Sequence, residues 1–426
     1  MKRFICFLAI LFFLFTNNYT YAKTLDLSGE AAVLIDYNTN EILYEKNSHL
    51  KLYPASTTKM MTAILAVENS KLDELVTIDD EVVRLTYGSH IALEPGEVLT
   101  MDQLLHAMLL PSANDAALAI AKYIGGTIDN FVVMMNARAI ELGAVDTNFV
   151  NPNGLHDDSH VSSAYDLALI GKEAMEHEQI REIVNKIQYE IPPTNKKSES
   201  RYLKITNKLL YNSELIDVDG DLVGTMYPYA SGVKTGYTSH AKNCLVSYAD
   251  KAEQKLISVV LKADGFCVYA DTHKLLNYGF DNYKNVIIGH TNEFIDNISI
   301  RNGDTPYIAG ILDRDIIYPI SEFNRNDIEK KIVVREDLRA PIDKGQIIGE
   351  AEFLIDGKVI GGGNIISTAT VLIDPSTTIL GKIINNWYIF VFLIIILFRI
   401  YALVLRRKRK RLRGNGTMYR IPYNAK

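Results

Sequence analysis

The spacing of apolar residues divides the first two thirds of the chain into strand-like and helix-like stretches. Residues 31–36 and 42–45 are short apolar runs joined across Asn38-Thr39-Asn40, which predicts a β-hairpin. From about residue 56 to 171 the apolar positions follow a helical period, with more helix to residue 186. Strand-like runs return at residues 232–236, 244–249 and 256–261, and a helical run over 268–279 follows them. This order predicts an α/β (α+β) domain, in which helices flank an antiparallel sheet with a helical insertion.

The last third of the chain changes character twice. Residues 283–373 show short alternating strands, and Asp356-Gly357 is a hairpin signal, which predicts a small all-β module. Residues 387–405 then form a 19-residue apolar run, interrupted only by Arg399 and followed by seven basic residues up to Arg413. A run of this length can span a bilayer with its basic flank in the cytoplasm. An amphipathic helix lying on the membrane is the alternative.

Charge and composition indicate an exported protein. Residues 1–22 have a basic start, an apolar core and small residues at the end, which is typical of a secretory signal. Between this segment and residue 382, 32 basic residues stand against 51 acidic ones, and such a surface repels nucleic acid. Two of the three cysteines, Cys244 and Cys267, remain after the signal. They fall in separate strand and helix candidates, so we favour free, partly buried thiols, although a disulfide stays open.

Three short motifs carry the candidate chemistry: Ser56-Thr57-Thr58-Lys59, Ser112-Ala113-Asn114 and Lys234-Thr235-Gly236. The Ser-x-x-Lys spacing alone is weak evidence, because it occurs four times. It starts at Ser48, Ser56, Ser231 and Ser239. Ser56 follows Pro54 and opens an apolar run of helical spacing, so Ser56 and Lys59 should project from one face of a first helical turn. Ser56 is therefore the candidate nucleophile and Lys59 its base.

The second and third motifs each have a structural alternative. Ser112 and Asn114 fall on a predicted loop between two helical runs, where they either point into a cleft or cap a helix. Gly236 lies on a predicted strand and lets a substrate peptide approach the sheet edge closely, unless it is a turn glycine beside a surface lysine. All of these alternatives would have to coincide in this order along the chain, so the joint signal is strong.

The motifs give the chain a resemblance to a known family. From about residue 25 to 283 it resembles the low-molecular-mass penicillin-binding proteins, which are serine-type D-alanyl-D-alanine carboxypeptidases. Supporting segments are residues 53–60, 151–155, 232–238 and 275–280. Ala113 stands where the family often has Asp or Gly. The resemblance implies the penicillin-binding/serine β-lactamase-like transpeptidase fold, followed by a small all-β domain and one C-terminal transmembrane helix.

The resemblance also implies an acyl-transfer mechanism that needs no metal and no organic cofactor. Ser56 attacks the substrate while Lys59 takes its proton, and Ser112 relays a proton to the departing D-alanine. When water then hydrolyses the acyl-enzyme, we expect Lys59 to serve again as the base. A lysine at its solution pKa is charged, so burial and a neighbouring cation, Lys234, must lower the Lys59 pKa.

Five residues are implied to bind the substrate. Asn114 holds the peptide backbone and orients Lys59, while Lys234 and Thr235 receive the terminal carboxylate beside Gly236. The backbone N–H groups of Ser56 and Tyr237 resemble the family's oxyanion hole, which is typically worth about 3 kcal/mol per donor.

The expected function is a carboxypeptidase that removes the terminal D-alanine from peptidoglycan stem pentapeptides, with β-lactam antibiotics as covalent inhibitors. A D,D-endopeptidase or weak β-lactamase would share the site, and a non-catalytic β-lactam or muropeptide sensor is a further alternative. The predicted layout is a signal peptide (1–22), a catalytic domain (23–283), a β-sandwich (284–374), a transmembrane helix (387–405) and a basic cytoplasmic tail (406–426). The catalytic domain would lie on the cell-wall side of the cytoplasmic membrane.

Two other patterns mimic functional sites. His156 and His160 have the spacing of a zinc helix, but a turn signal precedes them and a capping box follows, so we favour a polar loop. Glu182 and Asn185 mimic the Glu-x-x-Asn element of class A β-lactamases, but they lie far beyond Ser112 near the end of a helical run. We therefore expect a surface helix there and slow β-lactam hydrolysis.

Overall fold

The computed structural model describes residues 25–252, 254–321, 328–335 and 337–413. The predicted signal at residues 1–22 and the tail beyond Arg413 lie outside the described residues. The chain divides into two compact units with a boundary near Val286, and a short stretch beginning at Pro319 returns to the first unit.

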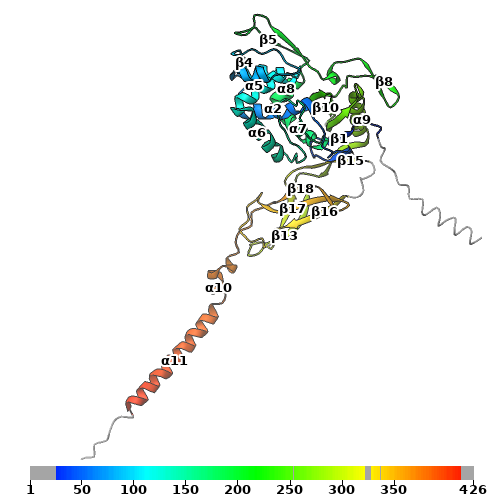
Figure 1. The fold of residues 1–426 in the computed structure, drawn as a ribbon. Helices are drawn as coiled ribbons and strands as arrows, with labels where there is room; N and C mark the ends of the chain where they lie inside the picture. The colour runs from blue at the N-terminus through cyan, green and yellow to red at the C-terminus, as the bar shows by residue number, and fades with distance from the viewer. Residues whose placement is uncertain (1–24, 253, 322–327, 336, 414–426) are drawn as a thin grey trace, which may run out of the picture. The chain divides into compact units, whose positions relative to one another are not determined.

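The first unit is built around a five-stranded antiparallel sheet with the strand order β2-β1-β11-β10-β9 (Figure 1). Its strands are β1 (Ala31–Asp36), β2 (Ile42–Lys46), β9 (Lys234–Thr238), β10 (Lys242–Lys251) and β11 (Gln254–Ala263). The predicted hairpin at residues 31–45 and the three later strands are therefore present. β9, which carries the third motif, is an edge strand, so one side of its backbone is not paired within the sheet.

Both faces of the sheet are covered by helices. Alternate residues of β1 pack into two different cores: Val33 and Ile35 lie in one, and Ala32 and Leu34 in the other. The first core also contains residues of the helices that lie in sequence between β2 and β9, whereas the second contains residues of α9 (Cys267–Asn282). These intervening helices are α2 (Lys59–Asn69), α3 (Asp80–Leu85), α4 (Met101–Leu109), α5 (Asn114–Gly125), α6 (Ile128–Glu141), α7 (Ala164–Glu176) and α8 (Glu178–Val184).

The helical stretch predicted from about residue 56 to 171 is interrupted in the structure. Residues 86–97 and 142–163 are largely irregular, and Gly88, Gly96, Gly143 and Gly154 in them adopt positive φ angles that a helix does not contain. Three small two-stranded sheets are also present that the sequence pattern did not predict. They are formed by β3 (Leu75–Thr77) with β4 (Val98–Thr100), β5 (Gln188–Ile191) with β6 (Arg201–Lys204), and β7 (Leu215–Val218) with β8 (Asp221–Gly224).

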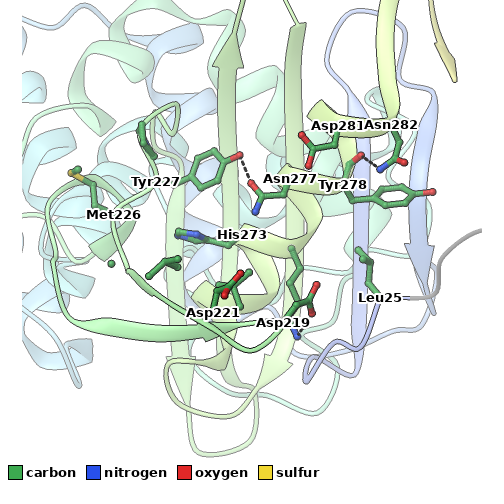
Figure 2. A pocket seen from close by; sticks show the side chains of 15 residues that line it. Leu25, Asp219, Asp221, Met226, Tyr227, His273, Asn277, Tyr278, Asp281 and Asn282 are labelled. Atoms are coloured by element: carbon green, nitrogen blue, oxygen red, sulfur yellow. Dashed lines mark hydrogen bonds and ion pairs between the residues drawn. The ribbon is translucent and has the colours of Figure 1, made fainter. Parts of the chain in front are cut away.

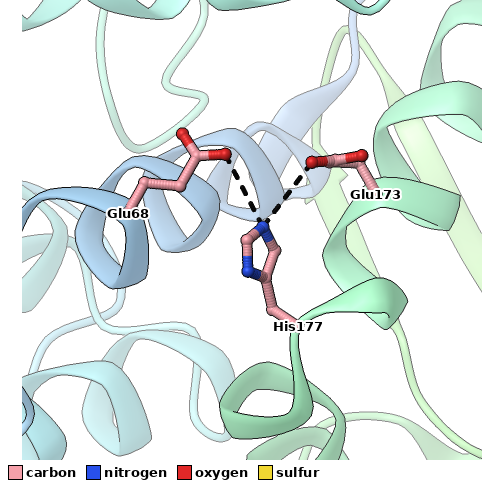
Figure 3. Close-up of side chains that lie close together, drawn as sticks. All are labelled: Glu68, Glu173 and His177. Atoms are coloured by element: carbon pink, nitrogen blue, oxygen red, sulfur yellow. Dashed lines mark ion pairs between the residues drawn. The ribbon is translucent and has the colours of Figure 1, made fainter.

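An ion-pair cluster ties three of the helices together. Arg138 of α6 donates through Nη2 to Glu68 of α2 at 2.7 Å and to Glu173 of α7 at 2.6 Å. His177 Nε2 lies 3.6 Å from the same two carboxylates (Figure 3). Both glutamates lie near the C-terminal ends of their helices, where negative charge is unfavourable. The guanidinium compensates this charge and holds the helix ends together.

The second unit is all-β over residues 287–318 and 328–373. Its main sheet is antiparallel, with the order β13-β14-β18-β17-β16, and it encloses a small core around Ile348, Phe353 and Ile365. The strands are β13 (Phe294–Ser299), β14 (Tyr307–Leu312), β16 (Ile328–Val334), β17 (Ile347–Ile355) and β18 (Lys358–Ser367), and β12 (Tyr283–Gly289) pairs separately with β15 (Ile316–Ser321). The predicted hairpin turn joins β17 to β18, with positive φ at Asp356 and Gly357.

Two helices follow the β strands: α10 (Ile379–Asn385) and α11 (Trp387–Arg413). Thr378 caps α10 by accepting a hydrogen bond from the N–H of Gly381. Residues Trp387–Arg411 of α11 form a helix long and apolar enough to cross a membrane, and their large apolar side chains are exposed.

Candidate active site

The first motif begins in a tight turn. Ser56 lies in the 3₁₀ turn η1 (Ala55–Thr58), and α2 begins at Lys59. The predicted first helical turn at Ser56 is therefore present, with 3₁₀ rather than α geometry. Residues three apart eclipse one another in 3₁₀ geometry, and Lys59 Nζ lies 2.9 Å from Ser56 Oγ. Two side chains that the sequence pairs by spacing are thus in direct contact.

The Lys59 ammonium or amine group is enclosed by oxygen atoms. It donates hydrogen bonds to Asn114 Oδ1 at 2.7 Å and to the backbone carbonyl of Asn153 at 2.6 Å. Both oxygens can only accept, so they take two N–H groups of Lys59. The third direction points at Ser56 Oγ. When Lys59 is neutral, its lone pair therefore faces the hydroxyl of Ser56, which is the arrangement that a general base requires.

Burial makes the neutral form of Lys59 accessible. The side chain is fully buried, and this burial lowers its pKa well below the usual value, with the nearby charge of Lys234 acting in the same direction and Asp115 opposing it. Lys234 is itself buried, and burial lowers its pKa to about 7. The pKa of Lys59 is therefore lowered by its own burial and by the charge of Lys234, whereas the pKa of Lys234 is lowered by burial.

The second motif approaches Lys59 from the opposite wall. Asn114 is the first residue of α5 rather than a loop residue, which corrects the prediction for this side chain. Its Nδ2 donates to the carbonyl of Tyr87 at 2.6 Å, so the amide is held at both ends. Ser112 does lie in the connection before α5, with φ +66°, and its Oγ is buried without a hydrogen-bond partner among the described residues. A buried hydroxyl without a partner is free to bond a ligand or relay a proton.

The third motif supplies the facing edge of the cleft. Lys234 Nζ donates to the carbonyl of Thr235 at 2.9 Å, and the hydroxyls of Thr235 and Thr206 are 2.6 Å apart. Tyr237 is exposed on the same strand. At Gly236, a Cβ atom would lie 3.0 Å from both the backbone nitrogen of Ser56 and the carbonyl oxygen of Pro54. The strand can approach the nucleophile this closely because residue 236 has no side chain.

Together these residues line a cavity of about 270 Å³ that contains Ser56, Ser112, Thr235, Gly236 and Tyr237. Asn114, Lys59 and Lys234 lie deeper and reach it through the hydrogen bonds given above. All eight predicted site residues are therefore gathered around one cleft, from segments as far apart in sequence as η1 and β9.

Three participants were not predicted. The Asn153 carbonyl fixes Lys59, the Tyr87 carbonyl fixes Asn114, and Thr206 contacts Thr235. The turn around Asn153 has a recognisable sequence signal. It comes so close to the nucleophile that a Cβ at Gly154 would overlap the Ala55 carbonyl oxygen at 1.9 Å. The other two contacts have no signal in the sequence.

The patterns set aside in the sequence are indeed not part of the cleft. His160 donates through Nε2 to Thr58 Oγ1 at 2.8 Å and accepts from the Val150 N–H at 3.0 Å, and burial lowers its pKa to about 4. It therefore braces a loop behind the first motif. Glu182 is exposed on α8, as expected. Cys244 and Cys267 are both free, but Cys267 is exposed rather than partly buried.

Comparisons with known proteins give the same picture for both parts of the chain. Residues 18–265 match a family model described as D-alanyl-D-alanine carboxypeptidase. Residues 283–372 match a second model, described as the C-terminal domain of penicillin-binding protein 5.

Individual relatives cover most of the chain. It is 33% identical over 375 residues to the D-alanyl-D-alanine carboxypeptidase DacF of Bacillus subtilis, covering 86% of this chain and 92% of that protein. It is 31% identical to DacA of Escherichia coli K12, covering 84% and 87% respectively. Among solved structures, penicillin-binding protein 5 of Haemophilus influenzae matches with a TM-score of 0.68 and 27% identity, covering 82% of this chain and 99% of that one.

Proposed function

The chain belongs to the D-alanyl-D-alanine carboxypeptidase family of penicillin-binding proteins and is a serine-type carboxypeptidase, and we propose that Ser56 is its nucleophile and Lys59 its general base. The family membership and the penicillin-binding fold predicted from the sequence are confirmed. The family implies peptidoglycan stems ending in D-Ala-D-Ala as substrate and β-lactams as inhibitors.

The observation that carries this assignment is the environment of Lys59. Two acceptor-only oxygens hold its N–H groups, and the remaining direction faces the Ser56 hydroxyl at 2.9 Å. Proton transfer from Ser56 Oγ to Lys59 Nζ lets the oxygen attack the carbonyl carbon of the penultimate D-alanine. Because burial lowers the Lys59 pKa, the neutral amine that can accept this proton is more accessible than in an ordinary lysine.

Ser112 is suited to the next step. Its unpartnered Oγ borders the cleft beside Asn114, which contacts Lys59. We infer that the proton held by Lys59 passes through the Ser112 hydroxyl to the nitrogen of the departing D-alanine as the C–N bond breaks. Water then hydrolyses the Ser56 ester, with Lys59 accepting a proton from the water.

The β9 side of the cleft binds the substrate in this proposal. The terminal carboxylate is received by Thr235 and Lys234, and its negative charge favours the charged form of Lys234, whose pKa burial otherwise lowers to about 7. The N–H groups of Ser56 and Tyr237 stabilise the oxyanion. The backbone of β9 is close enough to Ser56 for this, because a Cβ added at Gly236 would lie only 3.0 Å from the Ser56 nitrogen. Asn114 retains one N–H for the peptide backbone.

The anchor completes the proposal. α11 is long and apolar enough to span a membrane, and its last described turns carry six basic residues between Arg406 and Arg411. We propose that this basic end faces the cytoplasm and that the catalytic unit lies outside, where its substrate is. The division proposed for the chain remains a catalytic domain to residue 283, a β domain to 374 and a membrane helix at 387–405.

Labelling with a fluorescent penicillin tests the nucleophile. Ser56→Ala should lose the covalent label and the release of D-alanine from a D-Ala-D-Ala peptide. The matched variants Ser48→Ala and Ser239→Ala make the same substitution in Ser-x-x-Lys sequences that lie outside the cleft. They should retain the covalent label and the release of D-alanine. An adduct mapped by mass spectrometry to a serine other than Ser56 would remove the assignment.

A further inference from the structure

A second cavity of about 530 Å³ lies outside the catalytic cleft. One wall is the outer face of α9, with His273, Asn277 and Asp281, and the other is the β7–β8 hairpin with the segment that follows it (Figure 2). This volume is within the range of small-molecule sites. Neither Ser56 nor any other predicted catalytic or substrate-binding residue lines it.

The charges around this cavity are unbalanced. Its lining contains the carboxylates of Asp219, Asp221 and Asp281 and one cation, Lys274. Lys274 is already engaged, because its Nζ lies 3.2 Å from Asp219 and donates to the backbone carbonyl of Asp26 at 2.8 Å. Asp221 and Asp281 form no ion pair within the described part of the chain. The cavity therefore attracts a positively charged ligand.

A buried histidine adds a hydrogen-bond acceptor to the lining. His273 is 5% exposed, and its Nε2 donates to the carbonyl of Thr225 at 3.0 Å. Burial lowers the pKa of this ring, so it is neutral and Nδ1 is an acceptor. In the described residues Nδ1 has no hydrogen-bond partner. Asn277 Oδ1, in contrast, already accepts from the hydroxyl of Tyr227 at 2.9 Å.

The rest of the lining suits an aliphatic chain. Leu25, Val223, Met226 and the ring of Tyr227 contribute apolar surface, and the exposed Met226 side chain can adapt its shape. Carboxylates and a free imidazole nitrogen beside apolar walls match a primary ammonium group on a methylene chain, which needs acceptors around its head and apolar contact along its stem. We propose that this cavity binds an aliphatic primary ammonium group.

Helix α9 suggests the source of that group. Val268 and Tyr269 in its first turn line the catalytic cleft, whereas Asn277 lines the second cavity. Eight helical residues separate Tyr269 from Asn277, a distance of about 12 Å along the axis, which about four extended peptide residues would bridge. Resting on the proposed function, we infer that the ligand is the free side-chain amine of a diamino residue in a stem peptide next to the one being cleaved.

Direct binding is tested first on the full-length protein in detergent, with 1,5-diaminopentane as probe and 1-pentanol as its uncharged counterpart. Saturable binding of the diamine, observed by NMR, is expected, together with weaker or no binding of the alcohol. Asp281→Asn should weaken diamine binding about tenfold. Asp129→Asn, which makes the same charge change at an exposed position on α6, should not. No saturable binding, or equal loss in the two variants, would overturn the cavity as an ammonium site.

The source is tested with peptidoglycan fragments that carry adjacent stems. Acetylating their free amines should raise KM for wild type about tenfold and leave KM of Asp281→Asn unchanged, while kcat for a small D-Ala-D-Ala peptide stays the same for both proteins. If the diamine binds but acetylation has no effect on KM, the neighbouring-stem source is overturned, although the cavity still binds an ammonium group. Failure of wild type to release D-alanine from the small peptide would instead count against the proposed function.

Discussion

Replacing Lys234 with methionine should make the protein more stable and inactive, and the gain in stability should depend on pH. Methionine is close to lysine in length, so the change removes a buried amine and one hydrogen bond to Thr235 without opening a large cavity. Lys234 is 1% exposed, and its pKa of about 7 compares with 10.5 for a free lysine side chain.

The sign follows from linkage. A lowered pKa means that the folded protein disfavours the charged lysine, so the destabilisation is complete below about pH 7 and disappears as the pH rises toward 10.5. The shift of roughly 3.5 units corresponds to about 5 kcal/mol at low pH. Between pH 6 and 8.5 the same linkage relation removes about 2 kcal/mol of this penalty.

Urea unfolding, followed by circular dichroism on a chain that ends at Asn385, measures the effect. The free energy of unfolding of Lys234→Met minus that of wild type should be positive at pH 6 and should fall by about 2 kcal/mol at pH 8.5. Lys122→Met is the matched control, because that amine forms a partly exposed ion pair with Glu81 at 2.6 Å and should show no such fall. A difference for Lys234→Met that is the same at both pH values would refute the reasoning that burial depresses this pKa. D-Alanine release should be lost in this variant at either pH.

Three further predictions address the base, the turn behind the nucleophile and the topology. Lys59→Arg should slow acylation by penicillin at least about a hundredfold, because a guanidinium stays charged; stopped-flow rates within a factor of a few of wild type would exclude Lys59 as the base. Gly154→Ala should cost at least about 1–3 kcal/mol from its left-handed backbone and displace the Ala55 carbonyl, seen as a lower Tm and weak labelling; an unchanged Tm contradicts it. A membrane-impermeant maleimide should label the exposed Cys267 in intact spheroplasts and not in a Cys267→Ser variant; labelling only after lysis would reverse the proposed orientation.

The sequence predicted those parts of the fold whose signals are local. The β1–β2 hairpin, the two long strands β10 and β11, the closing helix α9 and the Asp356-Gly357 turn all follow from apolar runs between turn residues. The β5–β6 and β7–β8 hairpins were missed because each of their strands is only four residues long, too short to show a clear period. The β7–β8 hairpin does carry a local signal at its turn, because Asp219 and Gly220 both adopt positive φ there.

The candidate active site also has parts that the sequence predicts and parts that it does not. Side chains that act, such as Ser56 and Lys234, were found from residue type and spacing. The atoms that position them are largely backbone carbonyls, at Asn153 and Tyr87, and any residue type could supply these. The depressed pKa of Lys59 was expected in direction, but the enclosure by two acceptor-only oxygens that aims its lone pair at Ser56 is a three-dimensional property.

The surroundings of Lys59 also provide a way to count folded protein molecules. The groups that surround Lys59 or lower its pKa come from η1, α5, the loop around Asn153 and β9, which are separated by up to about 180 residues of chain and meet only when the first unit is folded. An unfolded or half-folded chain has an ordinary, protonated lysine beside its serine, and such a serine does not react with penicillin. Each folded molecule therefore binds one molecule of penicillin covalently, and unfolded molecules bind none. A ratio of bound label to total protein gives the native fraction after export, or during storage and mutational screening, without any substrate turnover.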